Sequence, residues 1–214
     1  ALRKVPGSVR QPLVGLAARV SKAKPPAERV LTKSVMCAFS LDWIVQRYQP
    51  PVVWVRRNPL NVVASLVELG TTLEHMERLY RRYRDPVLVE ALVEPMSLPE
   101  LPDGIDLVEQ CAYWVGLNTA GYESSARLHG SFATVDHDAL CADPSVGFQR
   151  LSARLGLEWN EAAEDFLRTS NRQGEGFETN RITALEPDRW RRSLADREDD
   201  LRRILSQFPG TQVS

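Results

Sequence analysis

The stretch VVWVRRNPLNVVASLVELG, Val52–Gly70, decides the fold that this sequence predicts. The run Pro51–Val55 is apolar and mostly β-branched, which is typical of a strand buried on both faces in a parallel sheet. Asn58 is a good helix N-cap and Pro59 a good first helical residue, so a helix is predicted to begin directly after Arg57. A buried strand that leads directly into a helix is typical of an α/β fold.

Outside this stretch, strands and helices are predicted to alternate. Further strands are predicted at Arg29–Thr32 and Phe132–Val135. Helices are predicted at Leu13–Val20, Ser40–Tyr48, about 106–128, from Asp143 to Gly156, after Asn160, and in a last amphipathic segment whose apolar face holds Trp190, Leu194, Leu201, Leu205 and Phe208. We therefore predict an α/β fold with a parallel sheet flanked by helices, as a single domain over residues 1–214.

The composition excludes several classes of function. A net charge of −1 gives no reason to expect nucleic acid or an anionic membrane as a partner, so an anion site must be local. The three cysteines are far apart and the histidines lack ligand spacing, so neither a disulfide framework nor a metal site is predicted. No apolar run has the length of a membrane span and no signal peptide is visible, so we expect a cytoplasmic protein.

The arginine at the strand–helix junction is a candidate anion ligand. The free N–H groups and the dipole of a helix start attract an anion, and Arg57 can hold a phosphate with two hydrogen bonds. Asn58, Asn61 and Ser65 form one polar stripe along the helix, from which the Ser65 hydroxyl can also donate. The alternative is a solvated arginine at a strand end with Ser65 facing water, and spacing alone leaves both open.

A strand followed by R-N-P-x-x-x-x-x-S at the start of a helix resembles the 3′-phosphate-binding motif of sulfotransferases that use 3′-phosphoadenosine 5′-phosphosulfate (PAPS). Its members here are Arg57, Asn58, Pro59 and Ser65. Three more segments resemble bacterial members of this family, in the family's order over roughly residues 29–208: VLTKSVMCAFSLDWI, VDHDALCADP…RLSARLGLEW and GEGFETNRI…PDRWRRSL.

The resemblance implies a P-loop-like sulfotransferase fold and a metal-free reaction. Such an enzyme transfers the sulfuryl group of PAPS to a hydroxyl or amine of a small-molecule or glycan acceptor and releases 3′,5′-adenosine bisphosphate. The family's N-terminal strand and glycine-containing loop, which bind the 5′-phosphosulfate, are not found. We therefore expect either that the sequence begins downstream of that loop or that parts of the protein are absent from it.

The resemblance also assigns roles to individual residues. Lys33 is the predicted catalytic residue, because animal cytosolic members have a Lys-Thr-His stretch where this sequence has Lys33-Ser34-Val35; the lysine is kept and the histidine is not. A fixed cation there stabilises the charge that develops on the departing phosphate. Gly174, Gly176 and Arg181 are predicted to bind the nucleotide with Arg57 and Ser65. The alternatives are a surface lysine and a surface loop.

The general base is left unassigned. We expect His137 to be packed and hydrogen-bonded, and His75 and His129 to be surface residues without supporting neighbours. Glu68 fits either a cleft or a solvated helix face. A second hypothesis is a non-catalytic nucleotide- or phosphate-binding module with a degenerate sulfotransferase fold. A kinase is disfavoured because the sequence has no GxxxxGK[ST] loop.

Overall fold

The computed structural model describes residues 31–83, 90, 97–130, 132–174 and 180–211, and the chain divides into two compact units, Ala1–Val35 and Met36–Ser214. In the first unit, the described residues are exposed and form neither helix nor strand. The strand predicted at Arg29–Thr32 is therefore absent from its described half, Leu31 and Thr32. The helix predicted at Leu13–Val20 lies outside the described residues.

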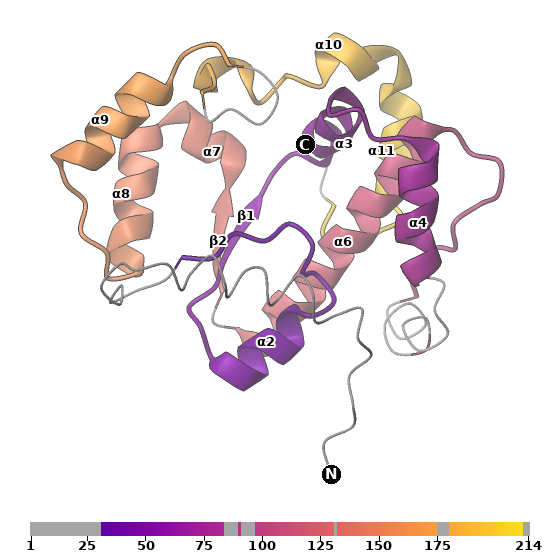
Figure 1. Ribbon diagram of the computed structural model, residues 1–214, viewed down its shortest axis with the longest axis horizontal. Coiled ribbons are helices and arrows are strands. Elements are labelled where there is room, and N and C mark those ends of the chain that lie inside the picture. The colour runs from indigo at the N-terminus through magenta and orange to yellow at the C-terminus, as the bar shows by residue number, and fades with distance from the viewer. Residues whose placement is uncertain (1–30, 84–89, 91–96, 131, 175–179, 212–214) are drawn as a thin grey trace, which may run out of the picture. The chain divides into compact units, whose positions relative to one another are not determined.

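The second unit is rich in helices and holds one small sheet (Figure 1). Its elements are α2 (Leu41–Tyr48), β1 (Val53–Arg56), α3 (Pro59–Glu68), α4 (Leu73–Tyr83), α6 (Leu107–His129), β2 (Ala133–Asp136), α7 (His137–Ala142), α8 (Pro144–Arg154), α9 (Glu161–Ser170), the short 3₁₀ turns η3 (Thr183–Leu185) and η4 (Ala195–Arg197), α10 (Arg191–Leu194) and α11 (Glu198–Leu205). The other helices predicted in this unit and the strands predicted at Pro51–Val55 and Phe132–Val135 are confirmed, with small shifts at their ends. The last segment, predicted as one element, is divided by η4 into α10 and α11.

The sheet pairs β1 with β2 in parallel, with Val53 opposite Ala133 and Arg56 opposite Asp136. The described residues form a helix-rich structure with a two-stranded parallel sheet flanked by helices, which is compatible with the predicted α/β class. Trp54 packs against Tyr122 of α6 with ring centroids 6.1 Å apart.

The opposite face of β1 is open, since Val55 is 49% exposed. Burial of β1 on both faces is therefore a wrong prediction. Successive side chains of a strand point to opposite faces, and within the described residues α6 covers the face of Trp54 while Val55 points the other way.

The core forms around α6, which packs against α2, α3, α4 and α11. Helix α6 begins with a capping box between Asp106 and Glu109 and ends at Gly130, whose positive φ of 61° suits glycine. The apolar face predicted for the last segment is confirmed, because all five of its predicted residues are buried: Trp190, Leu194, Leu201, Leu205 and Phe208. The C-terminal helix is thus part of the same core as α3.

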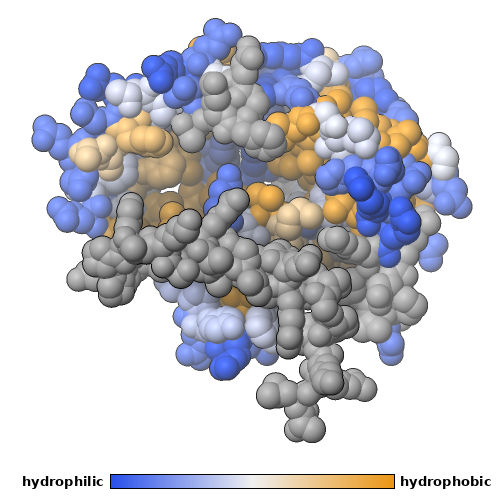
Figure 2. Space-filling view, viewed as in Figure 1, coloured by the Kyte–Doolittle hydropathy of each residue, from blue (hydrophilic) through white to orange (hydrophobic). Residues whose placement is uncertain are grey.

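Helices α8 and α9 are packed differently from this core, since neither has a fully buried residue. Phe148 and Trp159 stack on each other at 6.5 Å, whereas Val146, Leu157 and Phe166 remain exposed. Apolar surface is visible on this side of the molecule, at the left of Figure 2. The two helices therefore contribute less buried area to stability than α3, α6 and α11.

Gly116 of α6 lies against the ring of Phe208, and a Cβ built at this position would be 2.2 Å from Phe208 Cδ2. We expect Gly116→Ala to lower the free energy of unfolding by about 1–2 kcal/mol, since overpacking costs ~1–3 kcal/mol and the gain in helix propensity returns up to ~1 kcal/mol. Urea titration measures the change.

Gly121→Ala is the matched control because it lies in the same helix, gains the same propensity and meets its nearest atom, Phe39 Cε1, at 3.0 Å. A larger loss for Gly121→Ala than for Gly116→Ala would contradict the close packing of Phe208 on α6.

Candidate functional site

The N-terminus of α3 is capped by Asn58. Asn58 Oδ1 accepts a hydrogen bond from the Leu60 N–H at 3.0 Å. The Asn58 carbonyl accepts from the N–H groups of Asn61 and Val62, at 3.0 and 3.3 Å, and Pro59 has no N–H to offer. The expectation of free N–H groups here is therefore wrong. Asn58 accepts hydrogen bonds from the Leu60 and Asn61 N–H groups, and Pro59 has none. The predicted anion site at this junction is therefore left with side chains as its donors.

The side chain of Arg57 follows the carboxyl end of β1 and is 22% exposed. Its Nη2 donates to Glu186 Oε2 at 2.9 Å, whereas its buried Nε has no hydrogen-bond partner among the described residues. Burial lowers the pKa of Arg57 below its ordinary value; Glu186 opposes this shift and Arg189 adds to it. Arg57 is thus neither a solvated strand end nor a free cation, and one of its donors is unused.

Arg57 belongs to a chain of four charged side chains, Arg57, Glu186, Arg189 and Glu68, which we call the Arg57 cluster. Glu186 Oε1 lies 3.7 Å from Arg189 Nη1, and the carboxylate side chain is only 12% exposed. Arg189 Nη2 donates in turn to Glu68 Oε2. Glu68 is therefore an ion-pair partner instead of a purely solvated helix residue. Two cations and two anions leave the cluster with no net charge.

The neighbouring arginine has a different environment. The guanidinium of Arg56 lies over the ring of Trp54 at 5.5 Å, and its Nη2 donates to the Gly210 carbonyl at 3.5 Å. These are packing contacts of the kind that arginine makes with aromatic faces. Of the two arginines at the junction, Arg57 is the one that faces an anionic group.

Asn61 fixes the segment that carries Glu186 and Arg189. Its side chain is fully buried; Nδ2 donates to the Pro187 carbonyl at 2.8 Å, and Oδ1 accepts from the Trp190 N–H at 2.9 Å. The polar stripe predicted for α3 therefore does not form one solvent-facing row, because Asn61 faces the core. One amide therefore holds the backbone around Glu186 against the helix that begins beside Arg57.

Helix α7 follows β2 at the same edge of the sheet. Asp136 caps it by accepting from the N–H groups of Asp138 and Ala139. His137 Nδ1 lies 3.4 Å from Asp138 Oδ1 and 3.6 Å from Cys141 Sγ, so the expectation of a packed, hydrogen-bonded His137 is confirmed.

Cys141 does not have the environment of a nucleophile. Burial, together with Asp138 and Glu186, raises the pKa of the Cys141 thiol to about 11, and the positive charge of Arg57 only partly opposes this shift. A thiol in this environment stays protonated near neutral pH, so His137 and Cys141 do not form a thiolate pair.

Three of the other predicted ligands lie in the described part of the second unit. Ser65 is half-buried in α3, and its hydroxyl makes no hydrogen bond to another described residue. Arg181 is also half-buried; its N–H donates to the Ser170 carbonyl at 3.0 Å and its Nη1 to the Asn180 carbonyl at 2.5 Å. Gly174 is also half-buried. Their roles in nucleotide binding stay predictions.

Gly176 and Lys33 are the two remaining predicted site residues. Gly176 lies outside the described residues. Lys33 is exposed in the first compact unit, so its position is described only within that unit. The catalytic role of Lys33 stays a prediction.

Sequence reasoning missed Glu186 and Arg189 as members of the site. Glu186 is 129 positions from Arg57, and no local spacing links the two. Arg189 lies in PDRWRRSL, which is part of the family resemblance and of the predicted amphipathic segment, but neither signal singled out Arg189 or Glu186.

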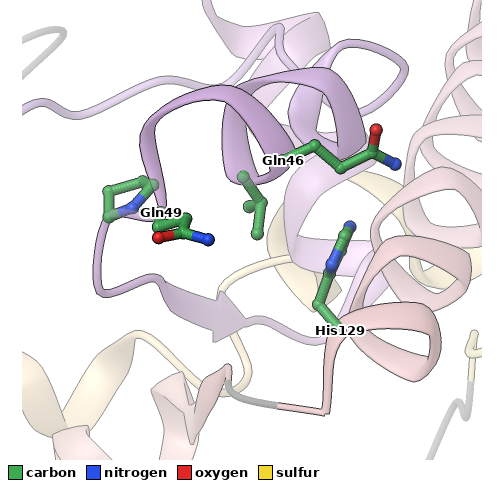
Figure 3. Close-up of a pocket in the computed structure, with 5 residues that line it drawn as sticks. Gln46, Gln49 and His129 are labelled. Atoms are coloured by element: carbon green, nitrogen blue, oxygen red, sulfur yellow. The ribbon is translucent and has the colours of Figure 1, made fainter.

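A hollow of about 500 Å³ lies at the other end of β1, where Gln49 and Pro50 lead into the strand. Figure 3 shows Gln46, Gln49 and His129 around it. His129 is 17% exposed and paired with Asp42, so the expectation of a surface histidine without neighbours is wrong. The pair joins α2 to the end of α6. Because Arg57 follows the carboxyl end of β1, this hollow is separate from the Arg57 cluster.

Comparison of the chain with protein-family models, with curated proteins and with solved structures found no match in any of the three. Among the residues that the structure describes, no group of three or more His, Cys, Asp and Glu side chains is arranged to hold a metal ion. No helix in the same part of the chain combines the length and apolar character that crossing a bilayer requires.

Asn61→Ala should destabilise the protein by about 2–4 kcal/mol, because it leaves the half-buried Pro187 carbonyl and the buried Trp190 N–H without partners, at ~1–3 kcal/mol each. Urea titration followed by circular dichroism measures the loss.

Asn118→Ala is the control, since Asn118 is also buried but makes one bond within its own helix, to the Trp114 carbonyl, and has an unpartnered Oδ1. We expect a smaller loss there. Equal losses would mean that the bonds across the core from Asn61 have no special weight.

Proposed function

We propose that the protein is a PAPS-dependent sulfotransferase of P-loop-like fold, which transfers a sulfuryl group to a hydroxyl or amine of a small-molecule or glycan acceptor. The observation that carries this proposal is that three segments with the family resemblance meet at Arg57. The β1–α3 junction supplies Arg57 itself, β2 and α7 lie beside it in parallel register, and the turn before Trp190 contacts it through Glu186.

The position of this meeting point also supports a ligand site. In open parallel sheets, ligands bind outside the carboxyl ends of the strands. Arg57 follows the carboxyl end of β1, and α7 follows that of β2. An arginine held there, with an unused buried N–H, suits a phosphate group better than a neutral ligand.

The proposed roles divide the nucleotide between several segments. Arg57 and Ser65 bind the 3′-phosphate, with Gly174, Gly176 and Arg181 contributing from the late loop. In the reaction, the bond between sulfur and the bridging oxygen of the phosphosulfate breaks as the acceptor oxygen or nitrogen bonds to sulfur. The acceptor loses a proton, and the bridging oxygen leaves as part of 3′,5′-adenosine bisphosphate. Lys33 stabilises the negative charge on that leaving phosphate.

A second candidate function is a nucleotide- or phosphate-binding module without catalysis. The lack of an assigned general base among the described residues favours it, since His137 Nδ1 is hydrogen-bonded to Asp138 and lies 3.6 Å from Cys141 Sγ. Transfer of radiolabelled sulfate from PAPS to a panel of hydroxyl and amine acceptors, measured with the full-length gene product, separates the two. Labelled product supports the enzyme; binding of the bisphosphate without transfer supports the module.

Arg57→Ala should weaken binding of 3′,5′-adenosine bisphosphate about ten- to hundredfold, the equivalent of ~1.5–3 kcal/mol for a hydrogen bond to a charged group. Binding of adenosine 5′-phosphate, which has no 3′-phosphate, should hardly change. Ser65→Ala should show the same selectivity with a smaller effect, because a neutral hydroxyl contributes less. Titration calorimetry measures all of these affinities.

Arg56→Ala is the matched control for Arg57→Ala. It removes the same charge from the same junction, but its guanidinium lies on Trp54 and contacts the Gly210 carbonyl. We expect no ligand-selective effect. Equal weakening of both nucleotides by Arg57→Ala, or equal effects of the two variants, would refute 3′-phosphate binding by Arg57.

Lys33→Ala should lower the rate of sulfuryl transfer by about a hundredfold, the loss typical of one group that stabilises developing negative charge. Affinity for 3′,5′-adenosine bisphosphate should change little, since this product has no sulfuryl group. Lys24→Ala, at a lysine with no assigned role, controls for lost charge in this part of the chain. A fall in affinity as large as the fall in rate would argue for a structural lysine.

A further inference from the structure

We infer that the phosphate-binding position of the site lies between Arg57 and Arg189, where the Glu186 carboxylate now resides, and that an incoming phosphomonoester displaces this carboxylate. The inference rests on the proposed function for the identity of the nucleotide. It adds Arg189 as a second phosphate ligand and makes Glu186 an internal competitor of the ligand.

The contacts of Glu186 resemble those of a bound anion. One carboxylate oxygen, Oε2, accepts from Arg57 Nη2 at 2.9 Å, and the other, Oε1, faces Arg189 Nη1 at 3.7 Å. Exposed fractions of 22% for Arg57, 12% for Glu186 and 21% for Arg189 describe side chains that are shielded but reachable from solvent. Two guanidinium groups thus converge on one carboxylate at the ligand-binding edge of the sheet.

A phosphomonoester meets this arrangement better than a carboxylate does. In the geometry observed, the carboxylate contacts Arg57 through Nη2 and turns its other oxygen toward Arg189, and the buried Nε of Arg57 has no partner among the described residues. A phosphomonoester has three terminal oxygens and a charge of about −1.5 to −2 at neutral pH. Its third oxygen can accept from the unused Nε, and its second charge balances the second arginine.

Displacement of the carboxylate requires only a side-chain movement. Asn61 holds the Pro187 carbonyl and the Trp190 N–H, and the Glu186 N–H donates to the Thr183 carbonyl at 3.2 Å. The backbone on both sides of Glu186 is therefore fixed while its flexible side chain rotates outward. Arg189 is also held from its far side by Glu68, so it stays in place as the carboxylate leaves.

An internal competitor lowers the apparent affinity for every anion by the fraction of molecules in which the site is open. Glu186→Gln keeps the size of the side chain but removes its charge, which weakens the competition. We expect it to tighten binding of 3′,5′-adenosine bisphosphate and of inorganic phosphate by about tenfold each, the scale of one charged hydrogen bond. Adding Arg189→Ala to the Glu186→Gln protein should weaken the binding of both ligands by a similar factor.

Asp188→Asn is the matched control, because Asp188 is two residues from Glu186 but pairs with Arg191 outside the Arg57 cluster, where its side chain is 76% exposed. It removes the same charge and should change affinity by less than about twofold, since an exposed pair contributes little. Glu186→Asp is a second test that retains the charge: its shorter side chain cannot reach both arginines, so affinity should also rise. Thermal melts confirm that each variant is folded.

Calorimetry with the two probes separates the possible outcomes. Unchanged or weaker binding of both probes in Glu186→Gln would overturn the inference and make Glu186 a residue that positions Arg57. An equal gain in Asp188→Asn would overturn it too, and would assign the effect to net charge. If bisphosphate binding depends on Arg57 but not on Glu186 or Arg189, the inference fails and the proposed function stands.

The reverse outcome is equally distinct. If inorganic phosphate follows the expected pattern but the bisphosphate binds no more tightly than phosphate, the phosphate position stands and the nucleotide function fails. Absence of binding by both probes to every variant would overturn both.

Discussion

The buried amide of Asn61 is the contact on which the arrangement of the site depends. It lies in the first turn of α3 and joins that helix to the turn around Pro187 and Trp190 through two hydrogen bonds. Because both polar groups of the amide are used in a fully buried place, this turn has one position against α3. That position brings Glu186 to the end of β1, and the charge pattern of the Arg57 cluster follows from it.

The parts of this structure that the sequence could predict are those with local causes. Asn58 and Pro59 start α3, and Gly156, with a positive φ of 62°, ends the segment of α8, because each satisfies backbone geometry within a few residues. The strand before Arg57 has the same kind of signal in its β-branched residues. Parallel pairing with the strand after Phe132 could also be predicted, from the order of strands and helices.

The parts that could not be predicted have distant causes. Nothing near Arg57 in the sequence indicates a carboxylate 129 positions later, and nothing near His129 indicates its pairing with Asp42. The exposure of Val55 depends on which helices cover each face of β1, which the composition of the strand alone does not determine. At the start of α3 the general rule that a helix N-terminus has free N–H groups gave a wrong prediction, because Asn58 accepts hydrogen bonds from these groups.

The pairing of Arg57 with Glu186 is difficult to explain by stability alone. Removing two charges from water offsets most of their attraction, and apolar residues of similar size are often as stabilising in such a place. The pair also leaves Arg57 Nε buried and unpartnered, which is an unfavourable state that a purely structural role would not require. A site that exchanges one anion for another explains both features. It needs the arginines held in place in the absence of ligand, and a bound group with three acceptor oxygens satisfies the donor that the carboxylate leaves unused.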